Sequence, residues 1–418
     1  MSGPGGSDAG GRGPAAGRAL ITGIGVAAPN GLGTGAWWSA VLEGRSGIGP
    51  ITRFDASGYP VRIAGEVPGF VDEDHIPSRL LPSTDRVTRL SLVAAKEALE
   101  DSGADPAALP GHRAGVITAS SAGGTEFGQR GLAALWGKGA QYVSAYQSFA
   151  WFHAAGTAEI SIRHVLRGPA SAVVTEQAGG IDTLARARRE IRKGVGLMVS
   201  GGLDSVLCPW GWAAHLADGR LSTDPDPALA YRPFDAEAGG HVVGEGGALL
   251  VLEDEEAARA RGAAGYAVVA GCAATFDGGP GEERLRDAAA LALADAGVRP
   301  DEVDAVFADG AGERAADRSE ARALASLFGP RGVPVTAPKS MTGRLGAGGS
   351  SLDLAAACLA LRDKVVPPTT GTRRVAADCP LDLVTGPARE LPGLRTVLVL
   401  ARGRGGFNSA AVLRAADA

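Results

Sequence analysis

The stretch VVTEQAGG, residues 173–180, decides the fold because it indicates a strand that turns sharply into a helix. Two β-branched residues lead to Thr175, and apolar side chains recur at helical spacing after Gly180. The apolar run GLMVSGG at 196–202 predicts the next strand. A strand, a helix and a strand in this order are typical of a βαβ unit, so we expect an α/β fold with parallel strands. We interpret the basic residues between 186 and 193 as the solvated face of the helix.

The apex of this turn is occupied by Gln177. A turn of this kind is well suited to expose a nucleophile, because it holds one side chain clear of the sheet. A carboxamide, however, can neither attack a carbonyl carbon nor take up a proton. The sequence therefore predicts the strand–turn–helix that usually presents a nucleophile, but with no nucleophilic side chain at its apex.

The second half of the chain repeats the pattern of the first. Residues 98–124 and residues 292–312 each contain an alanine-rich helix that ends at a glycine, an acidic loop with a proline, and a strand that runs into a turn of small residues. A repeat of this length predicts two similar α/β halves packed together. We divide the chain into a flexible tail at 1–17, an N-terminal half at 18–260 and a C-terminal half at 261–418.

Composition excludes several classes of protein. The 418 residues carry a net charge of −5, which disfavours nucleic acid and anionic membranes as partners. No apolar run reaches the ~18 residues of a membrane helix. The four cysteines are scattered and the six histidines lack metal-ligand spacing, so we expect no metal site and a reducing, cytoplasmic location. The glycine-rich stretches at 23–28 and 343–351 do not complete a nucleotide-binding pattern, so we expect no cofactor.

Five stretches form a more specific pattern together than any of them does alone. They are VVTEQAGG at 173–180, PFDAEAGGHVVGEGG at 233–247, VDAVFADGAGE at 303–313, KSMTGRLGAGG at 339–349 and GRGGFNSAAVL at 403–413. In this order, and over nearly the whole chain, they resemble the β-ketoacyl synthase branch of the thiolase superfamily. The resemblance implies a thiolase-like fold, in which two duplicated α/β halves stack as a five-layered αβαβα sandwich.

The chain departs from that family at the positions that carry its chemistry. Where active members have a cysteine and two histidines, this chain has Gln177, Asp309 and Arg344. In active members the thiolate accepts the acyl chain, and the imidazoles hold the thioester carbonyl as it becomes an enolate. Gln177 cannot be acylated, Asp309 would repel the enolate, and Arg344 keeps a positive charge of a different shape. The family's lysine is retained as Lys339, but we expect no catalytic residues for condensation in this chain.

Shorter phrases resemble one subgroup of the family. EQAGG at 176–180, SAYQSFAWF at 144–152, SGGLDS at 200–205 and CPWGW at 208–212 are similar to phrases of the chain length factors, the ketosynthase β subunits of type II aromatic polyketide synthases. The resemblance implies a subunit that forms a heterodimer with an active ketosynthase α subunit. It would shape the tunnel in which a poly-β-keto chain, delivered by an acyl carrier protein, grows. The apolar stretch 142–152 is a candidate for the interface, with core packing as the alternative.

Two other functions stay open at this point. One is a malonyl-acyl-carrier-protein decarboxylase that uses Gln177 to prime chain synthesis, as relatives with this glutamine do in loading modules. Those relatives keep both histidines, so Asp309 and Arg344 count against this function. The other is a binding protein unrelated to polyketides, which the loss of all three catalytic residues beside intact glycine turns argues against. In a non-catalytic subunit, Gln177 fills the space of the missing thiol and bonds to nearby backbone.

The helix expected at 125–136 carries a prediction about chain length. The resemblance implies that one face of this helix acts as a gate that limits growth of the chain. The corresponding residues are Thr125, Gly128 and Leu132, whose i, i+3, i+7 spacing places them on one face. Members that make eight-unit chains tend to have phenylalanine at the first and last of these positions. The smaller side chains here predict a chain of ten or more acetate units, unless Gly128 only permits close helix packing.

Overall fold

The computed structural model of the chain describes residues 17–279 and 283–416. Two mixed sheets dominate it. The first consists of β1 (Ala19–Ala28), β5 (Ala114–Ala119), β6 (Ala170–Val173), β7 (Leu197–Asp204) and β8 (Gly246–Asp254). The second consists of β9 (Ala267–Phe276), β10 (Ala305–Phe307), β11 (Pro334–Thr336), β13 (Asp382–Leu383), β15 (Thr396–Gly403) and β16 (Phe407–Ala415). A short antiparallel contact between β1 and β9 joins them edge to edge.

The two sheets have the same strand order and direction. In the first, β1 pairs antiparallel with β8 and β8 with β7, while β7, β5 and β6 run parallel. In the second, β9 pairs antiparallel with β16 and β16 with β15, while β15, β10 and β11 run parallel. This repeat confirms the predicted duplication of an α/β half. The division at 260 and 261 stays a prediction, and residues 1–16 of the predicted tail lie outside the described residues.

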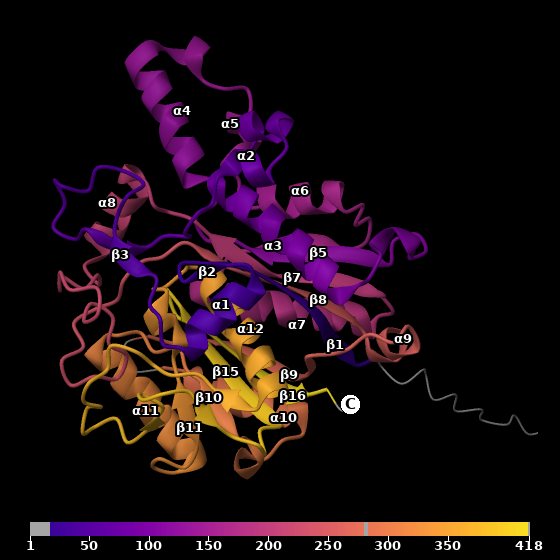
Figure 1. Cartoon of the computed structure of the whole chain (residues 1–418), viewed down its shortest axis with the longest axis vertical. Helices are drawn as coiled ribbons and strands as arrows, with labels where there is room; N and C mark the ends of the chain where they lie inside the picture. The colour runs from indigo at the N-terminus through magenta and orange to yellow at the C-terminus, as the bar shows by residue number, and fades with distance from the viewer. Residues whose placement is uncertain (1–16, 280–282, 417–418) are drawn as a thin grey trace, which may run out of the picture.

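Helices cover both sheets and fill the space between them (Figure 1). α3 (Arg86–Ser102) and α6 (Ala155–Arg163) pack on the outer face of the first sheet. α10 (Leu285–Ala296) packs on the outer face of the second sheet, with α11 (Arg314–Phe328) beside it. α7 (Gly179–Arg192) and α12 (Gly348–Asp363) lie between the sheets and contact both. The layers are therefore helix, sheet, helix, sheet, helix, as the resemblance implied.

The two central helices meet at their N-terminal ends. Residues 348–361 of α12 are buried on every side, because an alanine-rich helix between two sheets has no solvated face. A Cβ placed on Gly180 would lie 2.4 Å from the backbone nitrogen of Ser351, so this contact of α7 with α12 requires glycine. The close approach brings the start of α7 and the start of α12 to one place in the molecule.

The alanine-rich helix predicted to end at a glycine within residues 98–124 is confirmed as the C-terminal part of α3. The Asp85 side chain accepts the backbone N–H of Val87 at the N-terminus, and Gly103 ends the helix in the left-handed conformation with φ of 60°. The interpretation of residues 186–193 as a solvated face is wrong for Arg188. Its guanidinium bonds to the Asp295 carboxylate at 2.5 Å, and so it ties α7 to α10 of the second half. The pairing crosses 107 positions of sequence, which helical periodicity cannot reveal.

One segment stands apart from the layered body at the upper end of Figure 1: α4 (Thr125–Lys138) and α5 (Gln147–Ala150). No helix in the described part of the chain is long and apolar enough to cross a membrane. The remaining strands and α-helices are short, and among them α1 contributes Trp37, Trp38 and Val41 to the hydrophobic core. These elements are β2 (Gly31–Leu32), β3 (Ile48–Pro50), β4 (Ile63–Gly65), β12 (Val365–Val366), β14 (Arg389–Glu390), α1 (Thr34–Leu42), α2 (Asp72–His75), α8 (Pro209–Asp218) and α9 (Glu255–Ala260).

Candidate functional site

The turn between β6 and α7 has the form that the sequence predicted. β6 ends at Val173, a single 3₁₀ turn covers Glu176–Ala178, and α7 begins at Gly179. Glu176 has a φ of +50°, in the left-handed region that residues other than glycine rarely adopt. Gln177 follows it and is 1% exposed. We call this turn, residues 173–179, the elbow.

The Gln177 carboxamide is inserted against the start of α12. With its oxygen turned toward the donors, it accepts the backbone N–H groups of Gly346 at 3.2 Å and Leu345 at 3.3 Å. A Cβ on Gly349 would lie 1.8 Å from an end atom of this carboxamide, so the side chain fills the available space. These contacts support a structural role for Gln177, because a side chain that is bonded to fixed backbone groups is held away from a substrate.

Asp309 and Arg344 form a buried ion pair rather than two independent charges. Arg344 donates from Nη2 to Asp309 Oδ1 at 3.1 Å and from Nη1 to Oδ2 at 3.2 Å. Burial disfavours the charged carboxylate, but Arg344 and Arg402 together hold the pKa of Asp309 well below its usual range. The carboxylate therefore stays ionised, and its charge is matched by the guanidinium. The two residues that stand where the resemblance implies imidazoles therefore neutralise each other as a pair.

Backbone groups fix this pair in place. The Arg402 N–H donates to Asp309 Oδ1 at 2.9 Å, and Arg344 Nη2 donates to the carbonyl of Arg402 at 3.1 Å. The Asp309 N–H and the Gly310 N–H both donate to the Glu320 carboxylate, at 2.7 and 2.9 Å. The loop after β10 is thus tied both to the end of β15 and to α11. A change at Asp309 or Arg344 would disturb all three elements.

Lys339 has a partner that the sequence analysis missed. Its Nζ lies 2.6 Å from Asp353 Oδ2 and donates to the carbonyl of Ala308 at 2.6 Å, and both charged side chains are 3% exposed. Burial raises the pKa of the Asp353 carboxyl, and the charge of Lys339 acts in the opposite direction. Asp353 could have been singled out from sequence, since it is an acidic residue within the apolar run of α12. The Lys339 ammonium is engaged in this ion pair, and Lys339 does not line the cleft described below.

A cleft of about 760 Å³ opens beside the elbow. Asp309 and Arg344 line it, and so does Glu176, whereas Gln177 lies behind its wall. The elbow, the loop after β10 and the loop before α12 therefore meet at one cleft, as the resemblance implied. Further lining comes from α8, from the turn after β15 and from the start of β16, including Trp210, Arg404 and Phe407.

The three predicted gate residues lie in different surroundings. Thr125 lines the cleft at the start of α4. Gly128 is buried under the Trp210 ring, and a Cβ there would lie 3.1 Å from the ring atom Cζ3. Leu132 is 41% exposed and lies about one turn along α4 from Gly128, outside the lining of the cleft. Trp210, in the stretch CPWGW, fills the space that the missing side chain of Gly128 leaves.

The first turn of α4 is held by the carboxylate of Asp85, the residue that caps the N-terminus of α3. Asp85 Oδ2 accepts the N–H of Phe127 at 2.8 Å, while its Oδ1 accepts the N–H of Val87 at 3.1 Å. Burial raises the pKa of Asp85 to about 6. Arg53 adds an ion pair with Glu126 at 2.7 Å. These bonds fix where the gate helix begins relative to the first sheet.

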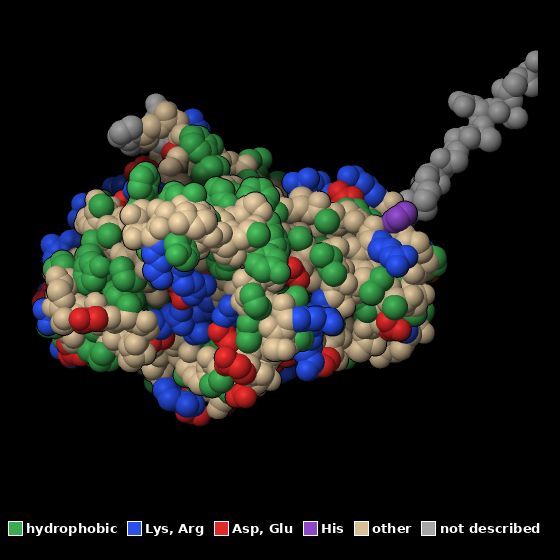
Figure 2. All heavy atoms as spheres, turned by 90° about the horizontal axis from the view of Figure 1, so that it is seen from above, with side chains coloured by type: hydrophobic (Ala, Val, Ile, Leu, Met, Phe, Trp, Pro, Cys, Tyr) green, Lys and Arg blue, Asp and Glu red, His purple; other side chains and the backbone are tan. Residues whose placement is uncertain are grey.

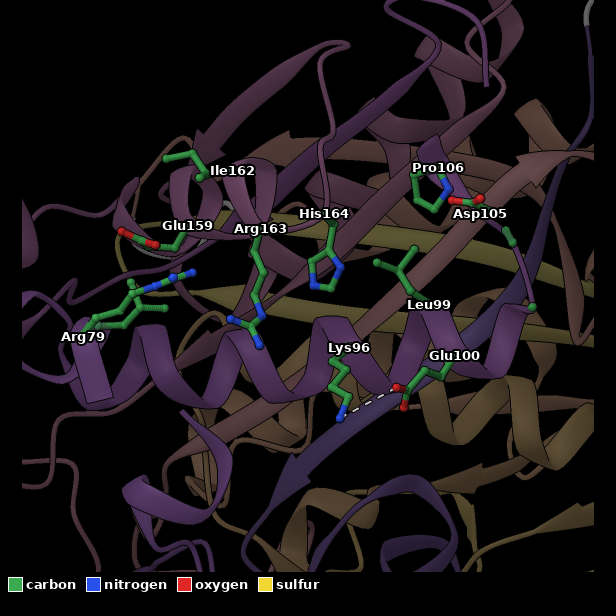
Figure 3. A pocket seen from close by; sticks show the side chains of 13 residues that line it. Arg79, Lys96, Leu99, Glu100, Asp105, Pro106, Glu159, Ile162, Arg163 and His164 are labelled. Atoms are coloured by element: carbon green, nitrogen blue, oxygen red, sulfur yellow. Dashed lines mark ion pairs between the residues drawn. The ribbon is translucent and has the colours of Figure 1, made fainter. Parts of the chain in front are cut away.

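A second pocket lies between α3 and α6 (Figure 3). Its volume is about 820 Å³, and no residue that lines it also lines the elbow cleft. Lys96 pairs with Glu100 at 3.7 Å, and both side chains are exposed. The lining mixes both signs of charge on solvated side chains, so it offers no defined ligand chemistry. Among the described residues, no three His, Cys, Asp or Glu side chains are placed to hold a metal ion.

An apolar face covers α4–α6 and the edge of the first sheet. Figure 2, which views the molecule from the side of α4 and α5, shows hydrophobic side chains gathered across it. β6 is the outermost strand and, among the described strands, pairs only with β5, so its other edge is free. Large exposed apolar side chains mark the face: Leu132, Trp136, Tyr142, Tyr146, Trp151, Phe152, Ile162, Val165 and Val174. We refer to these residues as the apolar face.

Comparisons with known proteins agree with this geometry. The family model described as the N-terminal domain of beta-ketoacyl synthase matches residues 17–258, and the one for the C-terminal domain matches residues 266–373. A relative from Streptomyces coelicolor, the actinorhodin polyketide putative beta-ketoacyl synthase 2, is 56% identical over 399 residues, or 94% of this chain and 98% of the relative. The tetracenomycin polyketide synthase ketoacyl synthase beta subunit of Streptomyces glaucescens is 54% identical over 400 residues, with the same coverage of both chains.

The corresponding alpha subunit of Streptomyces glaucescens is 38% identical over 417 residues and covers 95% of this chain and 96% of its own length. Among solved structures, the ishigamide ketosynthase/chain length factor superposes with a TM-score of 0.86 at 32% identity. A type II polyketide synthase acyl-carrier protein in complex with its ketosynthase bound to the hexaketide gives 0.86 at 27% identity. Each match covers 96% of this chain and 100% of the other.

Proposed function

This chain belongs to the β-ketoacyl synthase family, within the ketosynthase β subunits called chain length factors, and we propose that it is the non-catalytic partner of an active ketosynthase. The observation that carries the proposal is the buried Asp309–Arg344 pair beside Gln177. Condensation requires a thiolate and two groups that stabilise an enolate, and here each corresponding side chain is bonded within the protein itself. The chain therefore forms no carbon–carbon bond on its own residues.

The partner is an active ketosynthase α subunit, bound as a heterodimer. The free edge of β6 and the apolar face support this, because an exposed sheet edge beside large apolar side chains invites association. The stretch 142–152 contributes Tyr142, Tyr146 and Trp151 to that face, which favours the interface over core packing for this stretch. The ketosynthase/chain length factor among its structural relatives is similar at 32% identity.

The chain sets the length of the polyketide by shaping the tunnel at this interface. Thr125 borders the cleft with a small side chain, and Leu132 continues the same helix face toward the surface. The small side chain of Thr125 supports a product of ten or more acetate units, whereas the contact of Gly128 with Trp210 agrees with the alternative that Gly128 permits close packing. An acyl carrier protein delivers the malonyl and poly-β-keto groups, as the similarity to the carrier-protein complex supports. We place the complex in the cytoplasm.

Priming by decarboxylation at Gln177 is not favoured. The carboxamide is 1% exposed, does not line the cleft and is bonded to backbone at the start of α12. Arg344 lines the cleft, but its guanidinium pairs with the Asp309 carboxylate at 3.1 Å and is therefore not available to hold a malonyl carbonyl as it loses CO₂.

The test replaces Gln177 in the assembled heterodimer, with the partner ketosynthase and carrier protein supplied. Gln177→Met keeps the side-chain volume and removes the amide. The rate of polyketide formation per assembled complex should stay within about twofold of wild type, because the amide takes no chemical part. A loss of tenfold or more that is rescued by a preformed acetyl starter would establish the decarboxylase instead.

A further inference from the structure

The carboxylate of Glu176 occupies an unusual place at the elbow. Glu176 directly precedes Gln177, its φ of +50° lies in the left-handed region, and it lines the cleft. A residue with a side chain adopts that backbone conformation only where its surroundings hold it there. The contacts of the Glu176 side chain therefore have to offset the free-energy cost of this backbone conformation.

Two backbone N–H groups converge on this carboxylate. Glu176 Oε2 accepts the N–H of Arg404 at 2.9 Å, and the N–H of Gln177 acts on the same carboxylate as a second backbone donor that lowers its pKa. Arg404 lies in the glycine-rich turn after β15, which touches the elbow directly. A Cβ on Gly403 would lie 2.2 Å from the carbonyl oxygen of Thr175, so the turn has no room for a larger residue there.

Convergent backbone donors of this kind form a binding site for an anionic oxygen. In acyl transfer, two such N–H groups stabilise the oxyanion of the tetrahedral intermediate. The start of α7 adds the positive end of its helix dipole at the same point. The elbow therefore keeps its anion-binding donors although the nucleophile is absent, and an acidic side chain of the protein already fills the site.

We propose that Glu176 is an internal plug: its carboxylate occupies the oxyanion site formed by the N–H groups of Gln177 and Arg404 and shuts acyl thioesters out of it. The inference deepens the non-catalytic role proposed above and rests on it. It assigns the inactivity of the elbow to two separate changes, the loss of the nucleophile and the filling of the oxyanion site. Restoring the nucleophile by itself leaves the second change in place.

The charges around the plug agree with this assignment. Burial raises the pKa of Glu176, and Arg344 together with the two N–H groups acts in the opposite direction. The Arg404 side chain does not compete for the carboxylate, because its guanidinium pairs with Asp218 at 2.7 Å. The charge of Arg344 and the backbone donors thus together hold the plug, and the backbone donors are the ones that a thioester carbonyl needs.

The experiment uses Gln177→Cys as a reporter in the chain co-purified with its ketosynthase partner. The new thiolate attacks the carbonyl carbon of hexanoyl-N-acetylcysteamine, a C–S bond forms, the bond to N-acetylcysteamine breaks, and the released thiolate takes up a proton. Intact mass resolves the two subunits and gives the acylation rate of this chain alone. Alkylation by iodoacetamide measures access to the same thiol without forming an oxyanion, and wild-type chain gives the background of the native cysteines.

Adding Glu176→Gly to the reporter empties the site and suits the left-handed backbone. We expect the ratio of acylation to alkylation to rise about 100-fold, because oxyanion donors contribute on that order. Glu176→Gln is the matched control: it keeps an acceptor oxygen in the site, and its ratio should stay within about threefold of the reporter alone. If Glu176→Gly fails to assemble with the partner, Glu176→Ala tests the same rise.

A ratio that changes by less than threefold in the emptied variant overturns the plug. An equal rise in Glu176→Gln also overturns it, since charge rather than occupancy would then be the cause. The readout needs no polyketide, so a failure of the plug is distinct from a failure of the proposed function. The latter would appear as acylation of the wild-type chain or as the absence of a complex with the ketosynthase.

Discussion

Removing Arg344 alone should destabilise the protein far more than removing it together with its partner. In Arg344→Met, the Asp309 carboxylate stays buried at 1% exposure and loses two hydrogen bonds of 3.1 and 3.2 Å. Breaking a buried ion pair in this way costs about 3–5 kcal/mol. The Arg402 N–H at 2.9 Å and its side chain at 3.6 Å still face Asp309, so we expect the lower end, about 3 kcal/mol.

The double variant Asp309→Asn, Arg344→Met removes both charges and should recover most of this loss. The coupling energy between the two positions is therefore expected to exceed about 2 kcal/mol, at the upper part of the range for contacting residues. Urea unfolding of the wild-type, single and double variants gives this coupling directly. The control is the exposed pair Arg299–Asp301, 3.0 Å apart, where Arg299→Ala should leave the free energy of unfolding nearly unchanged because both side chains are solvated.

The pH dependence provides a second readout of the same cycle. In wild type the pKa of Asp309 is depressed in the folded state. Its contribution to the free energy of unfolding is therefore complete above the pKa that the carboxyl has in the unfolded chain, and it stays constant from pH 5 to pH 8. In Arg344→Met the pKa of the buried carboxyl rises, and protonation on acidification relieves part of the penalty. The cost of the substitution should therefore be larger at pH 8 than at pH 5. A cost below about 1 kcal/mol at pH 8, or a coupling below about 0.5 kcal/mol, would refute the reasoning.

Three further predictions concern the gate, the interface and acid stability. In the co-expressed complex, Thr125→Phe and Leu132→Phe should shorten the polyketide backbone by at least one acetate unit, measured by mass; unchanged length in both would remove the gate assignment. Trp136 is 83% exposed on the apolar face, and Trp136→Glu should weaken the heterodimer at least tenfold in size-exclusion or titration experiments. The control is Leu291→Glu, at a side chain that is 53% exposed on α10, and it should leave the affinity unchanged. Equal effects of the two substitutions would place the interface elsewhere. Burial lowers the pKa of His215 to about 4, below the ~6.5 of the unfolded chain, so stability is lost as pH falls from about 6.5 toward 4. His215→Gln should flatten that part of the stability curve, and an unchanged slope would show that His215 is not its cause.

The local elements of the fold could be predicted from the sequence because their determinants are close together in the chain. The helix at 86–102 is specified by its apolar periodicity, its Asp85 cap and the glycine that follows. The elbow is specified by one strand, one turn and one helix. The duplication was visible because both copies preserve the same order of helix, loop and strand. The five-layered packing came from the family resemblance, since periodicity alone does not say which faces meet.

The contacts that define the site could not be predicted, because they join distant parts of the chain. Glu176 and Arg404 are 228 positions apart, and the donor on Arg404 is a backbone N–H that no side-chain pattern marks. Asp309 and Arg344 were identified one at a time, as a repelling charge and a retained charge, and only their 3.1 Å separation makes them a pair. Trp210 was present in a noted phrase, but its contact with Gly128 depends on how α8 and α4 pack.

The most direct test of the central claim follows labelled acyl groups through the complex. The chain and an active ketosynthase are purified together, supplied with carrier protein that bears radiolabelled or mass-labelled malonyl and acetyl groups, and both subunits are measured by intact mass. Our account predicts that polyketide forms only when both subunits are present and that acyl adducts appear on the ketosynthase alone. An acyl adduct on this chain, or condensation by this chain without the ketosynthase, would contradict the account.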